Sequence, residues 1–235
     1  MQLFYNSEIT NNTQQLTFDK TESRHIILVL RKNLGDKIFI TNGLGQLFTS
    51  EIVIANDKKC LVIITNIEDY KKPWNYYLHI AIAPTKLNDR LEWFLEKATE
   101  IGIDEITPII CEHSERKVVK IDRMEKIIHS AAKQSLKYHF PKLNKPIPFN
   151  QFINSNFDGQ LFIAHCEETY KKSLKLELKP MLKTTIIIGP EGDFSAKEIQ
   201  QSLEHNFIPV SLGKSRLRTE TAGIVAVHSV AYTNE

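Results

Sequence analysis

Residues 184–198 read TTIIIGPEGDFSAKE, and this stretch decides the fold class. The continuous run Thr184–Ile188 has the length of a strand and no charged residue, so we expect a strand whose two faces are both covered. Two glycines follow in the loop Gly189–Gly192, and Ser195–Glu198 then matches a capping box, which begins a helix. A buried strand that leads through a loop into a helix is typical of a parallel sheet with helices on both faces.

The same alternation continues on both sides of this stretch, over residues 71–235. A helix is predicted to be capped by Asp89, with Glu92 three residues on, and to end at Gly102. Its apolar residues recur at helical spacing: Leu91, Phe94, Leu95, Ala98 and Ile101. Further strands are expected at 78–83, 106–110, 161–164 and 208–212, and further helices at 122–136 and 219–232. This order of elements predicts an α/β domain.

Residues 1–70 differ, because short apolar segments alternate there with turn residues. Strands are predicted at 37–41, 48–54 and 60–67, with a turn at Asn42–Gly45 and the compact apolar run His25–Leu30 before them. Short strands at this spacing favour a small β-barrel. We therefore divide the chain into a β-domain, residues 1–70, and an α/β domain, residues 71–235.

Composition limits the possible functions. The 235 residues carry a formal net charge of +2, far below that of a protein that binds duplex nucleic acid by charge alone, so any contact with a nucleic acid must rest on local patches. Cys60, Cys111 and Cys166 are widely spaced and form no CxxC pair, so we expect three buried thiols in a reducing compartment and no structural zinc. No apolar run reaches membrane-spanning length and no signal peptide is recognisable, so a cytoplasmic protein is expected.

Two loops after predicted buried strands carry the residues suited to chemistry. Gly189–Asp193 has glycines that let a ligand approach the backbone, and ligands of open α/β sheets bind at the carboxyl ends of strands. Leu212–Thr221 combines backbone donors, basic side chains and one carboxylate. Within it, Gly213–Ser215 imitates the end of a P-loop, but Ile208 stands where that motif requires glycine. The plain alternative for both loops is an ordinary strand-to-helix turn.

The two loops, in IIIGPEGDFSAKEI and SLGKSRLRTETA, resemble the C-terminal motifs of the bacterial 16S rRNA uridine-N3 methyltransferases of the SPOUT superfamily. Residues 86–109, 114–120, 131–135 and 24–38 resemble further segments of that family, in the same order. Three positions depart from its pattern. Asp193 stands where glycine is usual, Ser215–Leu217 replaces a more apolar stretch, and Leu136–Lys137 replaces Gly-Arg.

The resemblance implies both fold and function. Such proteins have an N-terminal PUA-like β-barrel and a C-terminal SPOUT α/β domain tied in a deep trefoil knot. They are homodimers that use S-adenosyl-L-methionine to methylate N3 of one uridine in 16S rRNA, in the small ribosomal subunit. Two alternatives stay open: another SPOUT RNA methyltransferase, such as one that acts on a tRNA ribose 2′-hydroxyl, and a non-catalytic RNA-binding module.

Methyl transfer from a sulfonium needs no metal, but the acceptor must lie in line with the methyl carbon and uridine N3 must lose its proton. Arg218 is predicted to stabilise the developing charge or orient the base, and Glu220 to act either as the base or, as we favour, as a structural partner of Arg218. The predicted cofactor-binding residues are Gly189, Pro190, Glu191, Gly192, Leu212, Gly213, Leu217, Arg218, Thr219 and Thr221. The predicted RNA-binding residues are Arg24, His25, Arg31, Lys86 and Arg90, for each of which a solvated surface role is the alternative. Trp93 and His228 are predicted to pack, in the core or at a dimer interface.

Overall fold

The computed structural model describes residues 1–167 and 170–235, which group into two compact units. Unit 1 comprises Met1–Pro73 and Ala132–Phe140, and unit 2 comprises Trp74–Ala131 and Pro141–Glu235. The division expected at residue 70 placed Ala132–Phe140 in the α/β domain. The structure groups this segment with unit 1 because its backbone bonds to the turn at residues 42–45: Gly45 N donates to Tyr138 O at 2.8 Å, and Phe140 N donates to Gly43 O at 2.8 Å.

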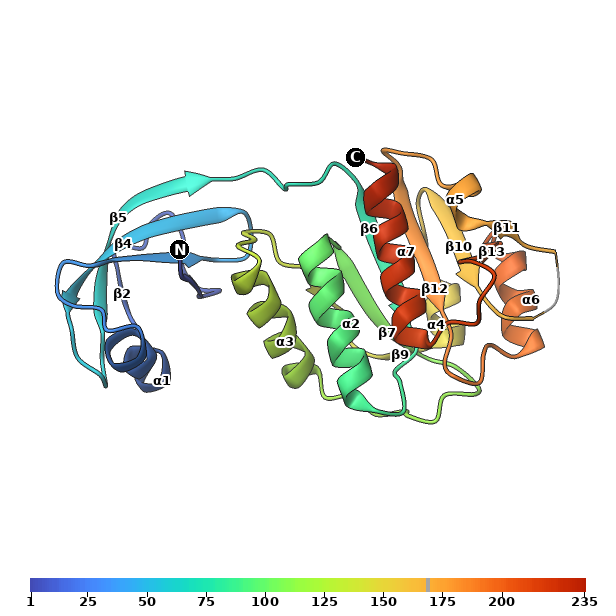
Figure 1. Ribbon diagram of the computed structural model, residues 1–235, viewed down its shortest axis with the longest axis horizontal. Helices are drawn as coiled ribbons and strands as arrows, with labels where there is room; N and C mark the ends of the chain where they lie inside the picture. Colours follow the sequence, from blue (N-terminus) through green and yellow to red (C-terminus); the bar gives the residue numbers. More distant parts are fainter. Residues whose placement is uncertain (168–169) are drawn as a thin grey trace. The chain divides into compact units, whose positions relative to one another are not determined.

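Unit 1 is built on a five-stranded sheet in the order β1-β3-β4-β5-β2 (Figure 1). Its elements are β1 (Leu3–Tyr5), β2 (Gln15–Thr17), α1 (Lys20–Arg24), the π-helical turn η1 (His25–Val29), β3 (Lys37–Thr41), β4 (Gln46–Ile54) and β5 (Leu61–Asp69). Strands β3, β4 and β5 pair antiparallel, and β1 pairs parallel to β3. The three strands predicted from the sequence are confirmed.

The apolar run His25–Leu30, which precedes the predicted strands and was assigned no element from the sequence, is helical over His25–Val29. Asp19 caps α1 by accepting from Glu22 N at 2.8 Å, and α1 continues directly into η1. The turn buries Ile26 completely and leaves Leu28 and Val29 exposed. A run of only six residues does not show whether its period is that of a strand or of a helix, which explains why the sequence assigned it no element.

Unit 2 is a parallel sheet in the order β11-β13-β10-β12-β6-β7-β8, with β9 paired to β7 (Figure 1). Its strands are β6 (Tyr77–Ile82), β7 (Glu105–Ile110), β8 (Lys142–Leu143), β9 (Ile147–Pro148), β10 (Gln160–Ala164), β11 (Lys172–Ser173), β12 (Lys183–Ile188) and β13 (Ile208–Ser211). Its helices are α2 (Asn88–Ile101), α3 (Ile121–Gln134), which runs into unit 1, α4 (Phe149–Ile153), α5 (Leu174–Glu177), α6 (Ala196–Glu204) and α7 (Thr219–Thr233). The predicted α/β architecture is confirmed.

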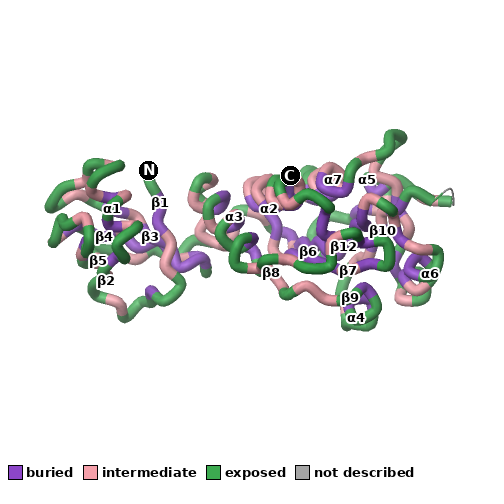
Figure 2. The backbone as a smooth tube through the Cα atoms, turned by 90° about the horizontal axis from the view of Figure 1, so that it is seen from below, coloured by how far each residue is buried: buried purple, intermediate pink, exposed green. Residues whose placement is uncertain are grey.

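Helices cover both faces of this sheet, so its central strands are buried (Figure 2). Leu78, Ile80 and Ile82 pack in one core with residues of α2, α3 and α7, whereas Ala81 and Ala83 pack in a second core with residues of α4 and α6. The run Thr184–Ile188 is buried throughout, as expected of a strand covered on both sides. None of the helices in the described part of the chain has both the length and the apolar character needed to cross a membrane.

The two predicted helix caps have different outcomes. The capping box at α6 is confirmed, because Ser195 Oγ accepts from Glu198 N and Glu198 Oε2 accepts from Ser195 N at 2.9 Å. The cap at Asp89 is wrong: α2 begins one residue earlier, and its N-cap, Leu87, makes no side-chain bond. Asp89 lies in the first turn, where its negative charge faces the positive end of the helix dipole.

A polar cluster lies at the amino ends of β6 and β7. His79 Nε2 lies 2.7 Å from Thr107 Oγ1, and Asn144 Nδ2 donates to the same oxygen at 2.7 Å. Burial lowers the pKa of His79 to about 4, while the nearby Glu105 carboxylate opposes this shift. The imidazole is therefore neutral in the folded protein at pH 7.

We expect folding stability to fall as the pH drops from 6.5 towards 4, and His79→Gln to remove part of this loss. A histidine whose pKa is lowered by folding contributes stability that is complete above its unfolded pKa and is lost as the pH falls towards its folded pKa. Between pH 7 and pH 5 this amounts to about 2 kcal/mol for His79. Urea unfolding of both proteins at the two pH values measures it; an identical loss in the variant would show that His79 does not titrate in this way.

Candidate active site

The loop after β12 and the loop before α7 meet at the carboxyl end of the parallel sheet. Thr219 Oγ1 donates to the carbonyl oxygen of Gly189 at 3.0 Å, and this bond is buried. A Cβ on residue 189 would lie 2.9 Å from the ring of Phe194, so only glycine allows this packing. The structure thus brings together the two loops that the sequence singled out.

A two-lobed cavity lies between these loops. Its smaller lobe, about 270 Å³, is lined by Gly189, Pro190, Glu191, Arg218 and Thr219, and is called here the β12-side lobe. Its larger lobe, about 630 Å³, is lined by residues 164–167, Lys171 and residues 210–217, and is called the β13-side lobe. The two lobes share the lining residues Ala164, Cys166, Asp193, Arg216, Leu217 and Ala222.

Most of the predicted cofactor-binding residues line this cavity. Leu212, Gly213 and Leu217 line the β13-side lobe, and the residues named above from 189–191 and 218–219 line the other. Two of the predicted cofactor-binding residues do not line it. Gly192 packs against His113, since a Cβ added at residue 192 would lie 3.1 Å from the Cβ of His113. Thr221 lines a separate hollow beside Trp93.

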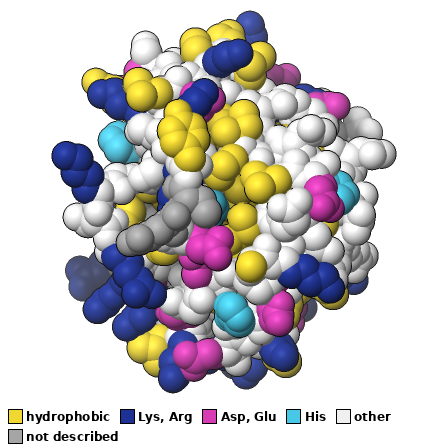
Figure 3. Space-filling view, turned by 90° about the vertical axis from the view of Figure 1, so that its right-hand side faces the viewer, with side chains coloured by type: hydrophobic (Ala, Val, Ile, Leu, Met, Phe, Trp, Pro, Cys, Tyr) yellow, Lys and Arg dark blue, Asp and Glu magenta, His cyan; other side chains and the backbone are white. Residues whose placement is uncertain are grey.

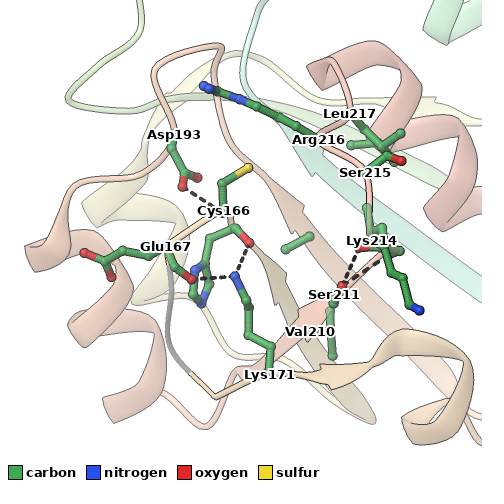
Figure 4. Close-up of a pocket in the computed structure, with 15 residues that line it drawn as sticks. Cys166, Glu167, Lys171, Asp193, Val210, Ser211, Lys214, Ser215, Arg216 and Leu217 are labelled. Atoms are coloured by element: carbon green, nitrogen blue, oxygen red, sulfur yellow. Dashed lines mark hydrogen bonds between the residues drawn. The ribbon is translucent and has the colours of Figure 1, made fainter.

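The end of β10 contributes a wall that the sequence analysis missed. Cys166 lies in both lobes and is exposed, so the expectation that all three thiols are buried is wrong for this residue, while Cys60 and Cys111 are buried. In Figure 4, Cys166 and Asp193 lie opposite Ser215 and Leu217. Ligands bind at the carboxyl ends of parallel strands, and residues 161–164 were predicted to form such a strand. The same rule therefore predicts that the residues after 164 lie at the ligand site.

Asp193, where glycine is usual in the family that the sequence resembles, has a structural explanation. Its φ is +63°, in the left-handed region that glycine adopts freely and that aspartate tolerates better than most residues. Its Oδ2 accepts from Cys166 N at 2.7 Å, so the carboxylate fixes the start of the loop after β10. The departure from glycine therefore adds a link between two walls of the cavity.

Glu191 connects its loop to the segment between β6 and α2. Its Oε1 accepts from Lys86 N at 2.9 Å, and Arg116 Nη2 donates to Lys86 O at 2.7 Å. Through this oxygen, Glu191 therefore orders its own loop. Its other oxygen, Oε2, is buried without a partner among the described residues, which leaves one acceptor for a ligand.

Glu220 pairs with a different arginine from the one expected. Its carboxylate is almost fully buried, and Oε1 lies 3.8 Å from Nε of Arg90. Among the described residues, the ion partner of Glu220 is thus Arg90 on α2, and the favoured pairing with Arg218 is wrong. Arg218 is exposed and lines the β12-side lobe, which leaves its guanidinium available to a substrate.

The residues predicted to bind RNA occupy different settings. Arg24 and Arg31 are exposed in unit 1, and His25 Nδ1 lies 3.8 Å from Glu22. Lys86 pairs with Glu115 at 2.8 Å, and Arg90 pairs with Glu220. Their contact with RNA stays a prediction.

Two aromatic side chains that we expected to pack are exposed. Trp93, on α2, is 43% exposed, and His228 is exposed on α7. Neither is therefore part of the core, and their place at a dimer interface stays a prediction.

Thr219→Val should weaken the link between the two loops without changing the size of the side chain. Loss of the Thr219 hydroxyl leaves the Gly189 carbonyl oxygen buried without this hydrogen bond, which costs about 1–3 kcal/mol of stability. Urea unfolding with and without S-adenosylmethionine measures the effect, and we expect cofactor affinity to fall too. Thr233→Val, at the last residue of α7, is the matched control, because Thr233 Oγ1 donates only within its own helix, to Ser229 O at 2.8 Å. Equal effects of the two substitutions would contradict a special role for the Thr219 bond.

Two family models match the chain. The model described as "RNA methyltransferase domain" matches residues 72–231, and the one described as "RNA methyltransferase PUA domain" matches residues 18–65. Among curated proteins, ribosomal RNA small subunit methyltransferase E of Buchnera aphidicola subsp. Acyrthosiphon pisum is 33% identical over 225 residues, which cover 91% of this chain and 86% of that protein. The chain belongs to the ribosomal RNA small subunit methyltransferase E family.

Solved structures support this membership. The probable rRNA-methyltransferase from Porphyromonas gingivalis is 41% identical, with a TM-score of 0.92 over 100% of this chain and 98% of that one. Ribosomal RNA small subunit methyltransferase E from Neisseria gonorrhoeae, bound to S-adenosyl methionine, is 27% identical, with a TM-score of 0.81 over 97% of this chain and 96% of that one. Membership confirms the expected family and the mixed fold of a PUA domain and a methyltransferase domain.

Proposed function

We propose that this protein transfers the methyl group of S-adenosyl-L-methionine to N3 of one uridine in 16S rRNA, in the small ribosomal subunit and in the cytoplasm. One observation carries the proposal: the loops Gly189–Asp193 and Leu212–Thr219 enclose a cavity with Arg218 in its wall. The S-adenosyl methionine bound to the Neisseria relative supports the choice of cofactor. The name shared by the relatives supports the choice of RNA.

The residues of the cavity fit such a cofactor. Val210, Leu212 and Leu217 supply apolar side chains in the β13-side lobe, and the Gly189 carbonyl oxygen accepts from Thr219 at the start of α7. Glu191 Oε2, buried and unpartnered, is an acceptor for a hydroxyl or amine of the cofactor. These groups would hold the sulfonium compound, which when bound supplies an electrophilic methyl carbon.

The chain's own residues would act on the uridine. Arg218, exposed at the cavity, would stabilise the negative charge that develops on the uracil oxygens as N3 loses its proton. Glu220 would orient Arg90 at the junction of α2 and α7, because its Oε1 lies 3.8 Å from Arg90 Nε. Its Oε2 is buried without a partner among the described residues. Charge stabilisation by Arg218 is the main catalytic effect of the side chains in this proposal.

The proposal includes a homodimer and a deep trefoil knot in unit 2. Helix α7 supports the dimer, because its sequence TETAGIVAVHSVAYT holds one charged residue and is apolar on all sides, whereas only one side packs on the sheet and α2. The knot is what the family resemblance of the two C-terminal loops implies, and a buried hydrogen bond from Thr219 Oγ1 to Gly189 O joins these loops.

RNA binding is proposed to use local basic groups, since the net charge is only +2. Arg24, His25 and Arg31 of unit 1 and Lys86 and Arg90 of unit 2 are the proposed contacts. In the space-filling view from the side of α6 and β11, apolar side chains lie centrally and several Lys and Arg side chains gather near one edge (Figure 3). Exposed basic side chains such as Arg24 and Arg31 give a phosphate backbone local sites of attraction.

Methylation of small ribosomal subunits and of free 16S rRNA with labelled cofactor, followed by mapping of the modified nucleotide, tests the proposal. We expect 3-methyluridine at one site. A 2′-O-methylated ribose, or modification of tRNA instead, would favour a different SPOUT methyltransferase. RNA binding without any binding of S-adenosylmethionine would favour a non-catalytic module.

A further inference from the structure

The cavity contains a buried histidine without a hydrogen-bond partner. His165 follows β10 directly and is 7% exposed. Within the described chain, neither Nδ1 nor Nε2 of its ring has a partner, and the residue lines the β13-side lobe. A polar group buried in this way destabilises the fold unless something supplies the missing bonds. Such a group in a ligand cavity indicates that the ligand supplies them.

The backbone of His165 is held in place from two sides. Ala164, the residue before it, pairs with Ile188 of β12 and with Val210 of β13. The ammonium group of Lys171 donates to the carbonyl oxygens of His165 and Glu167, as Figure 4 shows for the Lys171 amine. The backbone that carries the imidazole is thus positioned before a ligand arrives, which reduces the entropy lost on binding.

The imidazole is neutral near pH 7. Burial, and then the charge of Lys171, lower the pKa of His165, against a weaker opposite effect of Asp193 and Glu167. A neutral imidazole carries one N–H donor and one acceptor lone pair. Its surroundings in this lobe include the apolar side chains of Val210 and Leu212. The lobe also holds charged side chains, among them Lys171 and Asp193. A neutral donor and acceptor suits an aromatic heterocycle better than a carboxylate, which would favour a cation.

We propose that His165 is a positioning residue that hydrogen bonds the adenine of the cofactor, at the base edge that carries N1 and the amino group. The adenine then lies in the β13-side lobe, and the methyl-bearing sulfur extends to the β12-side lobe, beside Arg218. This inference rests on the proposed function. It assigns recognition of the base to a side chain at the end of β10, outside the two loops that the sequence singled out.

Calorimetric titration of S-adenosylhomocysteine and S-inosylhomocysteine tests it. The second compound carries hypoxanthine, in which N1 gains a hydrogen and the amino group becomes a carbonyl. In the wild-type protein we expect the inosine compound to bind about tenfold more weakly. In His165→Leu, S-adenosylhomocysteine should bind about tenfold more weakly than in the wild type, and the preference between the two compounds should largely disappear. His165→Gln, which keeps a donor and an acceptor, should recover part of both.

Thermal unfolding of the ligand-free proteins separates this role from a structural one. His165→Leu should unfold at the same or a higher temperature than the wild type, since it removes a buried unpartnered group. Unchanged affinity in His165→Leu, equal weakening for both compounds, or a lower unfolding temperature would each overturn the inference. If the wild-type protein bound neither compound, the proposed function itself would fail, which is a different result from a wild-type protein that binds both equally.

Discussion

Arg218→Ala is expected to lower kcat for rRNA methylation by about 10²–10³-fold, the usual effect of removing one group that stabilises transition-state charge. Cofactor affinity should fall only modestly, because the apolar and backbone contacts of the cavity remain. The expected loss of rate follows from the position of Arg218, which is exposed in the wall of the β12-side lobe. The nearby carboxylate of Glu220 pairs with Arg90 and not with Arg218. Single-turnover methylation of small subunits, with calorimetric titration of the cofactor, measures both quantities.

Two further variants sharpen this experiment. Arg218→Lys keeps the charge but loses the planar fork of donors, so an intermediate rate is expected. Lys175→Ala removes an exposed cation on α5, outside the cavity, and should leave the rate unchanged. Near-normal turnover in Arg218→Ala would remove Arg218 from the active site.

Gly189→Val is expected to weaken cofactor binding by at least about tenfold. A Cβ at this position would lie 2.9 Å from the Phe194 ring, so the β12 loop must move, and with it the carbonyl oxygen that accepts from Thr219. Calorimetric titration of S-adenosylmethionine measures the loss, and circular dichroism confirms that the variant is folded.

A second substitution tests the cause of this effect. Phe194→Leu removes the ring that the new side chain meets, so the double variant of Gly189→Ala and Phe194→Leu should bind better than Gly189→Ala alone. Unchanged affinity in Gly189→Val would place the cofactor pocket elsewhere. Affinity that stays low in the double variant would mean that the steric contact with Phe194 is not the cause.

Local patterns made much of unit 2 predictable. The capping box at Ser195 and the uncharged run of β12 depend on neighbours in sequence, and both appear as expected. The helix cap at Asp89 failed because the same residue types can serve as a cap or lie in the first turn. In His25–Leu30, the apolar residues were too few to separate strand from helix.

The features that could not be predicted from the sequence depend on contacts between residues far apart in the chain. Ala132–Phe140 belongs to unit 1 because of backbone bonds to Gly43 and Gly45, which no local pattern encodes. The pairing of Glu220 with Arg90 instead of the nearby Arg218 depends on how α2 packs beside α7. His165 and Cys166 lack a motif of their own, and only the position of β10 beside β12 and β13 brings them to the cavity.

A crystal structure of the protein with S-adenosylhomocysteine is the most direct measurement. We predict the thioether between Gly189–Asp193 and Leu212–Thr219, its sulfur on the side of Arg218 and its adenine beside His165. Density for the ligand outside these two loops, or loops that stay closed on each other with no ligand between them, would contradict the proposed methyltransferase site.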